Sequence, residues 1–307
     1  MSHWSSTINW LKNIITSERP FYLNLLNGGV GFDAPFSSNE VGSIYIKNIA
    51  MISWNLLSLG LLKDTKSYAA AVKNDEAVDM VENSKPKLDL NDIIQVDFPD
   101  NQYFREQTEK KQIVLHHTVS GQGVDGDISW WRQTVERIGT AVIIGWDGKI
   151  YQCFSTKYWA HHLGCKTSNN EELNKGSIGI EIDSWGALMK KDDKWYPVKW
   201  DKNLRKNVPN TSVKPIQNVQ EYPQGFMGFN GYEKYTDAQI ESVRKLLMYW
   251  HEKYNIPLVY HSAMWNKSTK ALGGWPGIWT HVSFRGSGKS DCHPQPELIE
   301  MLKSLAK

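Results

Sequence analysis

The chain has 307 residues, with 35 Lys and Arg against 33 Asp and Glu, a formal net charge of +2, 40% hydrophobic residues and 22% charged residues. This balance is typical of a soluble globular protein with one large domain or two smaller ones, and it gives no electrostatic argument for a nucleic-acid partner. Cys153, Cys165 and Cys292 form no paired framework, so we expect reduced thiols and synthesis in the cytoplasm.

Residues 1–90 are predicted to form a small, mostly helical N-terminal region, whose role the sequence leaves open. The first twenty residues have neither a basic start nor a clean apolar run, which argues against a secretory signal. The uncharged stretch 48–62 is shorter than the roughly 18 residues of a membrane span, and its apolar positions have helical spacing. We therefore expect a core helix there and no membrane insertion.

A polar, proline-containing linker at 80–101 leads to a second domain, predicted over residues 95–307. Strands are predicted where short apolar runs are rich in β-forming residues: 111–119, two around the turn Asp147–Gly148 within 140–154, 176–183 and 256–262.

Two segments of this domain are predicted to be helical. Residues 128–139 suit a helix, and the clearest helix spans 235–257, where Thr236 and Gln239 form a capping box. Strands that alternate irregularly with helices predict an α/β fold of mixed α+β type, in which helices pack on the faces of a central mixed β-sheet.

Histidines stand at the ends of the predicted strands. His116 and His117 follow "IVL", His161 and His162 lie in "YWAHHLG", and His281 lies in "GIWTHVS". Because strand side chains alternate between faces, His116 and His117 cannot both enter one cleft.

Catalytic zinc takes three protein ligands from His, Cys, Asp or Glu and keeps a fourth position for water. His116 and His281 could meet this demand together with one residue of the adjacent Asp291, Cys292 and His293. The residues alone leave that third ligand open.

A zinc hydrolase also needs a general base and a positive group for the developing oxyanion. Glu181 is a carboxylate in an apolar strand, where it costs free energy unless it is used or paired. Lys289 stands two residues before Asp291. An ordinary edge-strand carboxylate and a solvated loop lysine are the alternatives.

Six segments taken together resemble the zinc-dependent N-acetylmuramoyl-L-alanine amidases, a family that includes phage endolysins and peptidoglycan recognition proteins. Within residues 100–305 and in the family's order, the segments are "IVLHHT", "WDGKIYQ", "YWAHHLG", "SIGIEI", "YTDAQIESVRKLL" and "THVSFRGSGKSDCHPQPEL". The resemblance implies that family's fold, Zn²⁺ as cofactor and bacterial peptidoglycan as substrate.

In this family the first ligand follows the last apolar residue of a strand and the second opens the final loop, which implies His116 and His281. The third ligand is a Cys eight positions after the second His or, in the muropeptide-amidase branch, an Asp ten positions after it. Asp291 stands ten positions after His281, so the resemblance favours Asp291, with Cys292 as the alternative third ligand. The catalytic Lys stands two positions before the ligand, which implies Lys289.

The resemblance implies Glu181 as the catalytic Glu, and it assigns His161 and Trp159 to substrate binding. Recognition-type members often use a Tyr where this chain has Thr140, and this departure shifts the catalytic role to Glu181. His117 is expected to be a supporting or structural residue. The polar and aromatic insert 189–232 is expected to be either one wall of the substrate groove or a tolerated surface insertion.

The resemblance implies an enzyme that cleaves the amide between N-acetylmuramic acid and the L-Ala of the stem peptide. We expect a monomeric phage endolysin that is made in the cytoplasm and reaches the cell wall after a separate protein opens the membrane. The alternatives are a non-catalytic peptidoglycan-binding module of the same fold, and a bacterial autolysin or muropeptide-recycling amidase.

Overall fold

The computed structural model describes residues 87–286 and 288–305. The apolar stretch 48–62, and all but the last four residues of the predicted helical region, lie outside the described residues. Within the described part of the chain, no helix is both long and apolar enough to cross a membrane.

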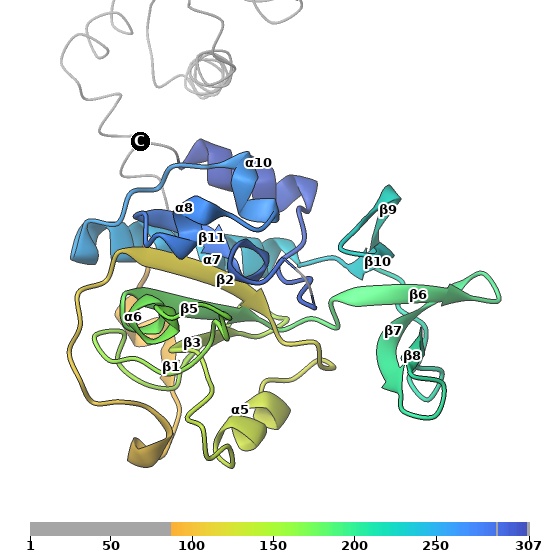
Figure 1. The fold of residues 1–307 in the computed structure, drawn as a ribbon, viewed down its shortest axis with the longest axis horizontal. Coiled ribbons are helices and arrows are strands. Elements are labelled where there is room, and N and C mark those ends of the chain that lie inside the picture. The colour runs from red at the N-terminus through yellow and green to blue at the C-terminus, as the bar shows by residue number, and fades with distance from the viewer. Residues whose placement is uncertain (1–86, 287, 306–307) are drawn as a thin grey trace, which may run out of the picture. The chain divides into compact units, whose positions relative to one another are not determined.

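A six-stranded mixed sheet forms the centre of the described domain (Figure 1). Its strands, in spatial order, are β1 (Ile93–Gln95), β4 (Ile150–Gln152), β3 (Val142–Ile144), β5 (Ser177–Ile182), β2 (Gln112–His117) and β11 (Gly277–Thr280). Neighbouring strands are parallel except for the β3–β4 hairpin. The central strands are apolar and buried on both faces, as parallel strands covered by helices require; Ile113, Leu115 and Ile180 have no exposed surface.

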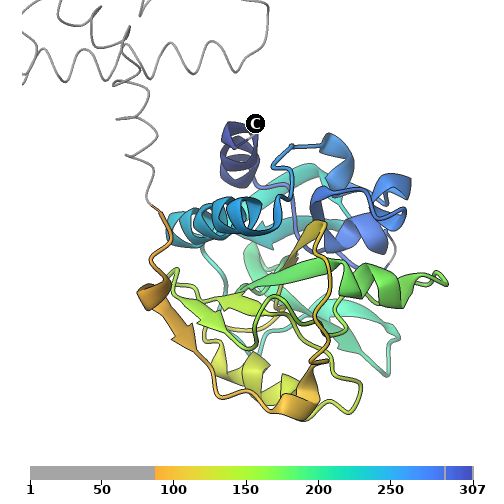
Figure 2. The same ribbon diagram turned by 90° about the vertical axis from the view of Figure 1, so that its left-hand side faces the viewer.

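Helices cover both faces of this sheet (Figures 1 and 2). They are α5 (Asp125–Trp131), α6 (Asn170–Lys175), α7 (Asp237–Tyr254), α8 (Thr269–Leu272), α9 (His281–Phe284) and α10 (Pro296–Ser304), with 3₁₀ turns η1 (Leu90–Asp92), η2 (Asp100–Gln102) and η3 (Ser262–Trp265). Helix α7 packs on one face with α10 against it, whereas α6, α8 and α9 lie over the other face.

Most of the predicted elements are confirmed. The strands predicted at 111–119 and 176–183 are β2 and β5, and the turn Asp147–Gly148 joins β3 to β4. Helix α7 begins at the predicted capping box, in which Thr236 Oγ1 accepts from the Gln239 N–H and the Gln239 side chain bonds back to the Thr236 N–H. It ends at Asn255, which takes the left-handed conformation with φ 54°.

Two predicted elements are wrong, each for a local reason. The helix predicted at 128–139 stops at Trp131, because the Thr134 hydroxyl accepts the Ile138 N–H and so offers the backbone an alternative to the helix. The run 256–262 is not a strand although Ile256 and Leu258 are buried. Pro257 has no N–H to donate to a neighbouring strand, and the edge of the sheet beside β2 is occupied by β11.

The insert between β5 and α7 folds into a second, five-stranded antiparallel sheet. Its order is β8 (Lys206–Pro209), β7 (Lys194–Asp201), β6 (Ala187–Lys191), β10 (Phe229–Glu233) and β9 (Val219–Phe226). This inserted sheet projects from the right-hand side of the domain in Figure 1. None of its strands was predicted, and its role as a groove wall or as a tolerated surface insertion stays a prediction.

Candidate active site

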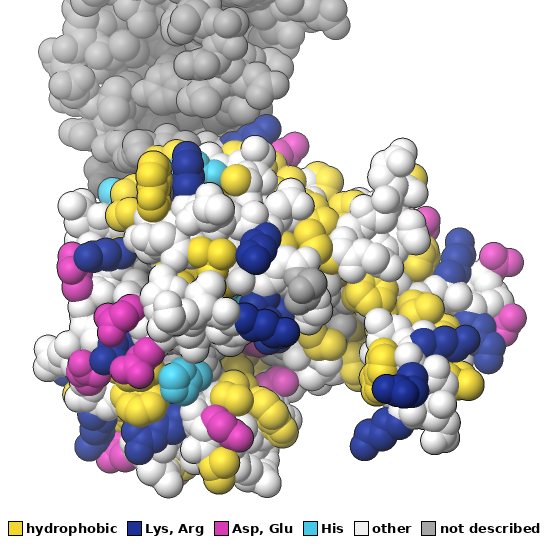
Figure 3. All heavy atoms as spheres, in the orientation of Figure 1, with side chains coloured by type: hydrophobic (Ala, Val, Ile, Leu, Met, Phe, Trp, Pro, Cys, Tyr) yellow, Lys and Arg dark blue, Asp and Glu magenta, His cyan; other side chains and the backbone are white. Residues whose placement is uncertain are grey.

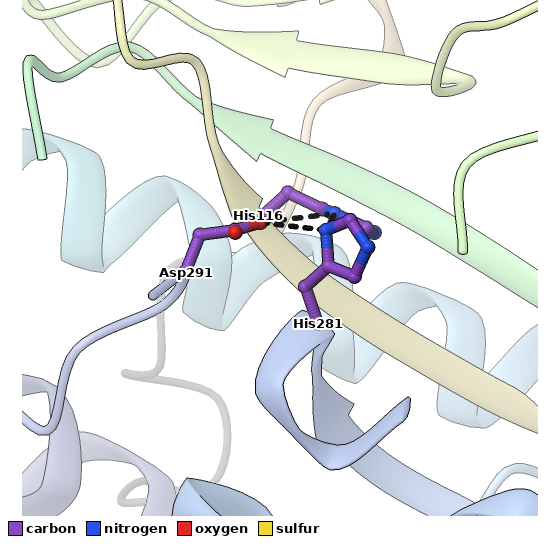
Figure 4. A group of neighbouring side chains, drawn as sticks. All are labelled: His116, His281 and Asp291. Carbon is purple, nitrogen blue, oxygen red and sulfur yellow. Dashed lines mark hydrogen bonds and ion pairs between the residues drawn. The ribbon is translucent and has the colours of Figure 1, made fainter. Parts of the chain in front are cut away.

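Three side chains from separate elements converge at the end of β2 (Figure 4). His116 lies near the end of β2, His281 begins α9 directly after β11, and Asp291 lies in the loop before α10. The parallel register that pairs Thr280 with Leu115 brings the two histidines side by side. The Asp291 Oδ2 atom lies 2.8 Å from Nδ1 of His281 and 3.3 Å from Nδ1 of His116, and the two Nδ1 atoms are 2.9 Å apart.

The outer nitrogen of His281 determines the protonation of that ring. Its Nε2 lies 2.8 Å from the Leu163 carbonyl oxygen. A carbonyl oxygen only accepts hydrogen bonds, so Nε2 carries the proton and the Nδ1 of the neutral ring presents a lone pair to the cluster.

A chain of three hydrogen bonds determines the protonation of His116 in the same way. The Ser177 hydroxyl donates its one proton to the Leu173 carbonyl at 2.7 Å, so it accepts from Nε2 of His162 at 2.9 Å. His162 Nδ1 then accepts from His116 Nε2 at 3.0 Å. The His116 Nδ1 atom therefore also presents a lone pair to the cluster.

This donor set fits a divalent metal ion. Two imidazole nitrogens and a carboxylate oxygen lie within 4.8 Å of one another and direct lone pairs at a common point, where a cation between them would be stabilised by all three. Two His and one carboxylate form a ligand set that zinc uses in catalytic sites, and each outer His nitrogen has the hydrogen-bond acceptor usual for a metal-ligating His. Burial raises the pKa of Asp291, but the His281 and His116 rings beside it outweigh burial and hold that pKa well below its ordinary value.

The structure separates Asp291 from its two neighbours. Cys292 has no exposed surface and contacts Tyr235 instead of the cluster, and burial raises the pKa of its thiol well above the ordinary value. His293 Nδ1 lies 2.8 Å from the Tyr222 hydroxyl and its Nε2 lies 3.1 Å from the Glu233 carbonyl. Of these three residues, only Asp291 shares the cluster with His116 and His281.

His117 points to the opposite face of β2, as strand alternation predicts. Its Nδ1 lies 2.8 Å from the Tyr235 hydroxyl at the start of α7, and burial lowers its pKa to about 4. The His117 ring packs against the rings of Tyr232, Tyr235 and His293, and the missing side chain of Gly186 leaves room for it. A Cβ at Gly186 would lie 2.3 Å from the His117 Nε2 atom.

The two residues with predicted catalytic roles lie beside the cluster. Glu181 pairs with His116 in the β2–β5 register, and its Oε2 atom lies 4.0 Å from His116 Nδ1. That oxygen is buried without a hydrogen-bond partner. Burial, and then repulsion from Asp291, raise the pKa of Glu181 well above its ordinary value, while the Lys289 ammonium acts in the opposite direction.

Residues 106–292 match a sequence model of a family described as N-acetylmuramoyl-L-alanine amidase. The match covers more than half of the chain. The chain belongs to this family. It is an enzyme, an N-acetylmuramoyl-L-alanine amidase that acts on peptidoglycan.

Several solved structures are similar to this chain at low sequence identity. They include PlyL (13% identity, TM-score 0.40, 70% of this chain and 99% of that chain). They also include the amidase LysC from Clostridium intestinale URNW, with 16% identity and a TM-score of 0.37 over 70% of this chain and 98% of that chain. An AmpD derivative has 14% identity and a TM-score of 0.39 over 71% of this chain and 96% of that chain. No curated protein sequence matches the chain. The family assignment rests on the match over residues 106–292.

The two side chains predicted to bind substrate, Trp159 and His161, pack against each other and against Phe104. Trp159 is 4% exposed, stacks on Phe104 at 3.9 Å and donates its indole N–H to Glu106. The His161 ring meets both aromatic rings edge-on at 5.4 Å. Their role in substrate binding stays a prediction, and their observed contacts are those of a packed aromatic group.

His162 is the residue of this region that sequence reasoning missed. It holds His116 through its Nδ1 atom, and Ser177 holds it in turn. The sequence shows two adjacent histidines at 161 and 162, and only the fold decides which of them faces β2. Nothing in the pattern around Ser177 marks that residue as part of the site.

Proposed function

We propose that this amidase is a zinc hydrolase, with His116, His281 and Asp291 as the protein ligands of the metal. The convergence of three lone pairs on one point, in a member of the N-acetylmuramoyl-L-alanine amidase family, is the observation that carries the proposal. A zinc ion held there supplies a Lewis acid that acidifies water and polarises the scissile carbonyl.

Proton transfer during hydrolysis is assigned to Glu181. Glu181 takes a proton from the attacking water and later returns it to the leaving amine of L-Ala, so that both products leave in stable protonation states. Support for this role comes from its unpaired Oε2 atom, 4.0 Å from His116. A carboxylate with no structural partner is available for proton transfer.

Lys289 pairs with the negative charge that develops on the carbonyl oxygen when water adds. It lies in the same loop as Asp291, and its ammonium charge acts on the pKa values of both His116 and Glu181. A fixed positive charge at this position stabilises the tetrahedral state more than the planar amide, which lowers the barrier.

Hydrolysis of purified cell walls tests this function. We expect turbidity to fall while new L-Ala amino ends appear, and we expect a chelator to stop the reaction and added zinc to restore it. Glu181→Gln should keep zinc and lose the activity, because the amide cannot accept the proton. Release of reducing sugar ends without L-Ala amino ends would assign the cleavage to a glycosidic bond and overturn the proposal.

We further propose the biological role of a monomeric phage endolysin, made in the cytoplasm and admitted to the wall by a separate membrane-opening protein. Induced expression in bacteria tests it. Cells should lyse only when a membrane-opening protein is made as well. Lysis by the amidase alone would contradict the need for a second protein, and a dimer in light scattering would contradict the monomer.

A further inference from the structure

A groove runs from the catalytic loop to the inserted sheet. It encloses about 1090 Å³, and its lining includes Lys289 and Asp291 on one side and residues of β6, β7, β9 and β10 on the other. Ligand pockets commonly enclose about 300–1,000 Å³, so this groove has more room than a single sugar ring needs. In Figure 3 hydrophobic side chains gather where the inserted sheet meets the rest of the domain.

The inserted sheet is fixed to the loop that carries Asp291. The Tyr222 hydroxyl of β9 donates to His293 Nδ1 at 2.8 Å, and the Tyr232 ring of β10 stacks on the His293 ring at 4.8 Å. The Glu233 carboxylate accepts the Trp185 N–H at 2.6 Å, just after β5. These contacts place the groove wall in a defined position relative to the cluster of His116, His281 and Asp291.

Aromatic faces dominate the wall that the inserted sheet contributes. Trp200 lines the groove and is 60% exposed, so its large apolar indole ring is available for a ligand. The Trp195 ring lies over Gly231, where an added Cβ would come within 2.5 Å of it, and its indole N–H donates to Glu221 at 3.3 Å. Asn207 and Asn230 add amide groups to the same lining.

The charge of the groove distinguishes between the two halves of the substrate. The inserted sheet contributes one cation and one anion to the lining, Lys190 and Glu221, so this wall of the groove has no excess of either sign. The stem peptide carries carboxylates and would favour a positive groove, whereas the N-acetylated sugar chain is uncharged. Flat aromatic faces match the C–H faces of sugar rings, and amide side chains match hydroxyl and acetamido groups.

We infer that the inserted sheet binds the glycan strand, so that this amidase takes peptidoglycan as a polymer with several sugar units in the groove beside the cleaved amide. The inference rests on the proposed function, because it places the cleaved bond at the cluster. Trp200 stacks on a sugar ring, and the asparagines bind the polar groups of the sugars.

Kinetics on two substrates with the same stem peptide test this inference in the full chain. One substrate is a soluble muropeptide with a single N-acetylmuramic acid, and the other is an uncrosslinked glycan strand that carries the same peptides. Trp200→Ala should lower kcat/KM on the strand about tenfold more than on the muropeptide, the size expected when one stacking contact is lost. Trp130→Ala is the matched control, since Trp130 is 58% exposed on α5 and does not line the groove.

Each other outcome has a defined meaning. Equal losses on both substrates would assign the groove to the stem peptide, and no loss on either would remove the groove from substrate binding; both results overturn the inference. If the unmodified chain released L-Ala amino ends from neither substrate, the proposed function would fail. The groove is then tested by titrating an N-acetylglucosamine tetramer into the full chain, where binding that Trp200→Ala weakens supports the inference and no binding overturns it.

Discussion

Replacing Ser177 by alanine perturbs the metal site without touching a proposed ligand. The Ser177 hydroxyl accepts from His162 Nε2 at 2.9 Å, and His162 in turn accepts from His116 Nε2 at 3.0 Å. Without the hydroxyl, His162 is free to place its proton on Nδ1, where it opposes the His116 Nε2 proton. The His116 lone pair would then no longer be held on Nδ1, the atom that faces His281 and Asp291.

The size of the effect follows from the burial of these groups. Ser177 is 3% exposed, so Ser177→Ala leaves a buried imidazole N–H without an acceptor, at a cost of about 1–3 kcal/mol. Removal of such an outer partner typically weakens metal affinity about 10- to 100-fold. We therefore expect the Zn²⁺ dissociation constant of Ser177→Ala to rise by that factor in a competition titration with a chelating dye.

A matched variant separates this effect from a general loss of stability. Ser242 is also a buried serine, and it donates to the Gly148 carbonyl at 2.6 Å, far in sequence from the cluster residues. Ser242→Ala should lower the thermal midpoint in the zinc-free state about as much as Ser177→Ala, and leave zinc affinity unchanged. Equal zinc affinity in Ser177→Ala and the unmodified chain would refute the assignment of ring protonation by the Ser177–His162–His116 chain.

Two further predictions concern lysines. Lys289→Ala should keep zinc and lower kcat on cell walls about 10²- to 10³-fold, as loss of an oxyanion partner does. The control Lys199→Ala, at an exposed position of β7, should change kcat little. If Lys289→Ala and the unmodified chain had equal kcat values, Lys289 would have no role in catalysis. Burial lowers the pKa of Lys110 from its ordinary value of 10.5 to about 7 in the folded chain. Between pH 7 and pH 10.5 the Lys110 amine is therefore protonated in the unfolded chain and neutral in the folded chain, so the free energy of unfolding should rise with pH. Urea unfolding at pH 7 and pH 9 should show this rise in the unmodified chain and in the exposed control Lys111→Met, but not in Lys110→Met; a rise that survives in Lys110→Met would contradict the assignment.

The elements that position the site could be predicted because their signals are local. The apolar run of β2 ends at His116, the turn Asp147–Gly148 joins β3 to β4, and the capping box at Thr236 begins α7. These features depend on residues close together in the chain, so the sequence contains them directly.

The inserted sheet lacks such signals. Most residues of β7 and β9 are half-buried or exposed, and both strands carry polar residues on both faces, so no clear alternation marks them. The pairing of β6 with β10 joins segments far apart in the insert, and the stacking of Tyr232 on His293 supports the sheet. Sequence reasoning named this segment as a candidate groove wall but could not find its strands.

Some residues of the candidate site could be predicted from the sequence, and others could not. The resemblance to the amidase family favoured Asp291 over Cys292, and of these two residues the fold brings only Asp291 to His116. The choice between His161 and His162 depends on the bridge of Ile138 to His161, which fixes the backbone of this segment. No local pattern gives that information, so the contact of His162 with His116 could not be predicted.

Zinc content of purified variants tests the metal site most directly. The unmodified chain and Cys292→Ser should each retain a single zinc ion after dialysis, measured by atomic emission against protein concentration. Asp291→Ala should lose most of its zinc under the same conditions while keeping a folded circular-dichroism spectrum. Full zinc in Asp291→Ala together with its loss in Cys292→Ser would contradict the cluster of His116, His281 and Asp291 as the metal centre.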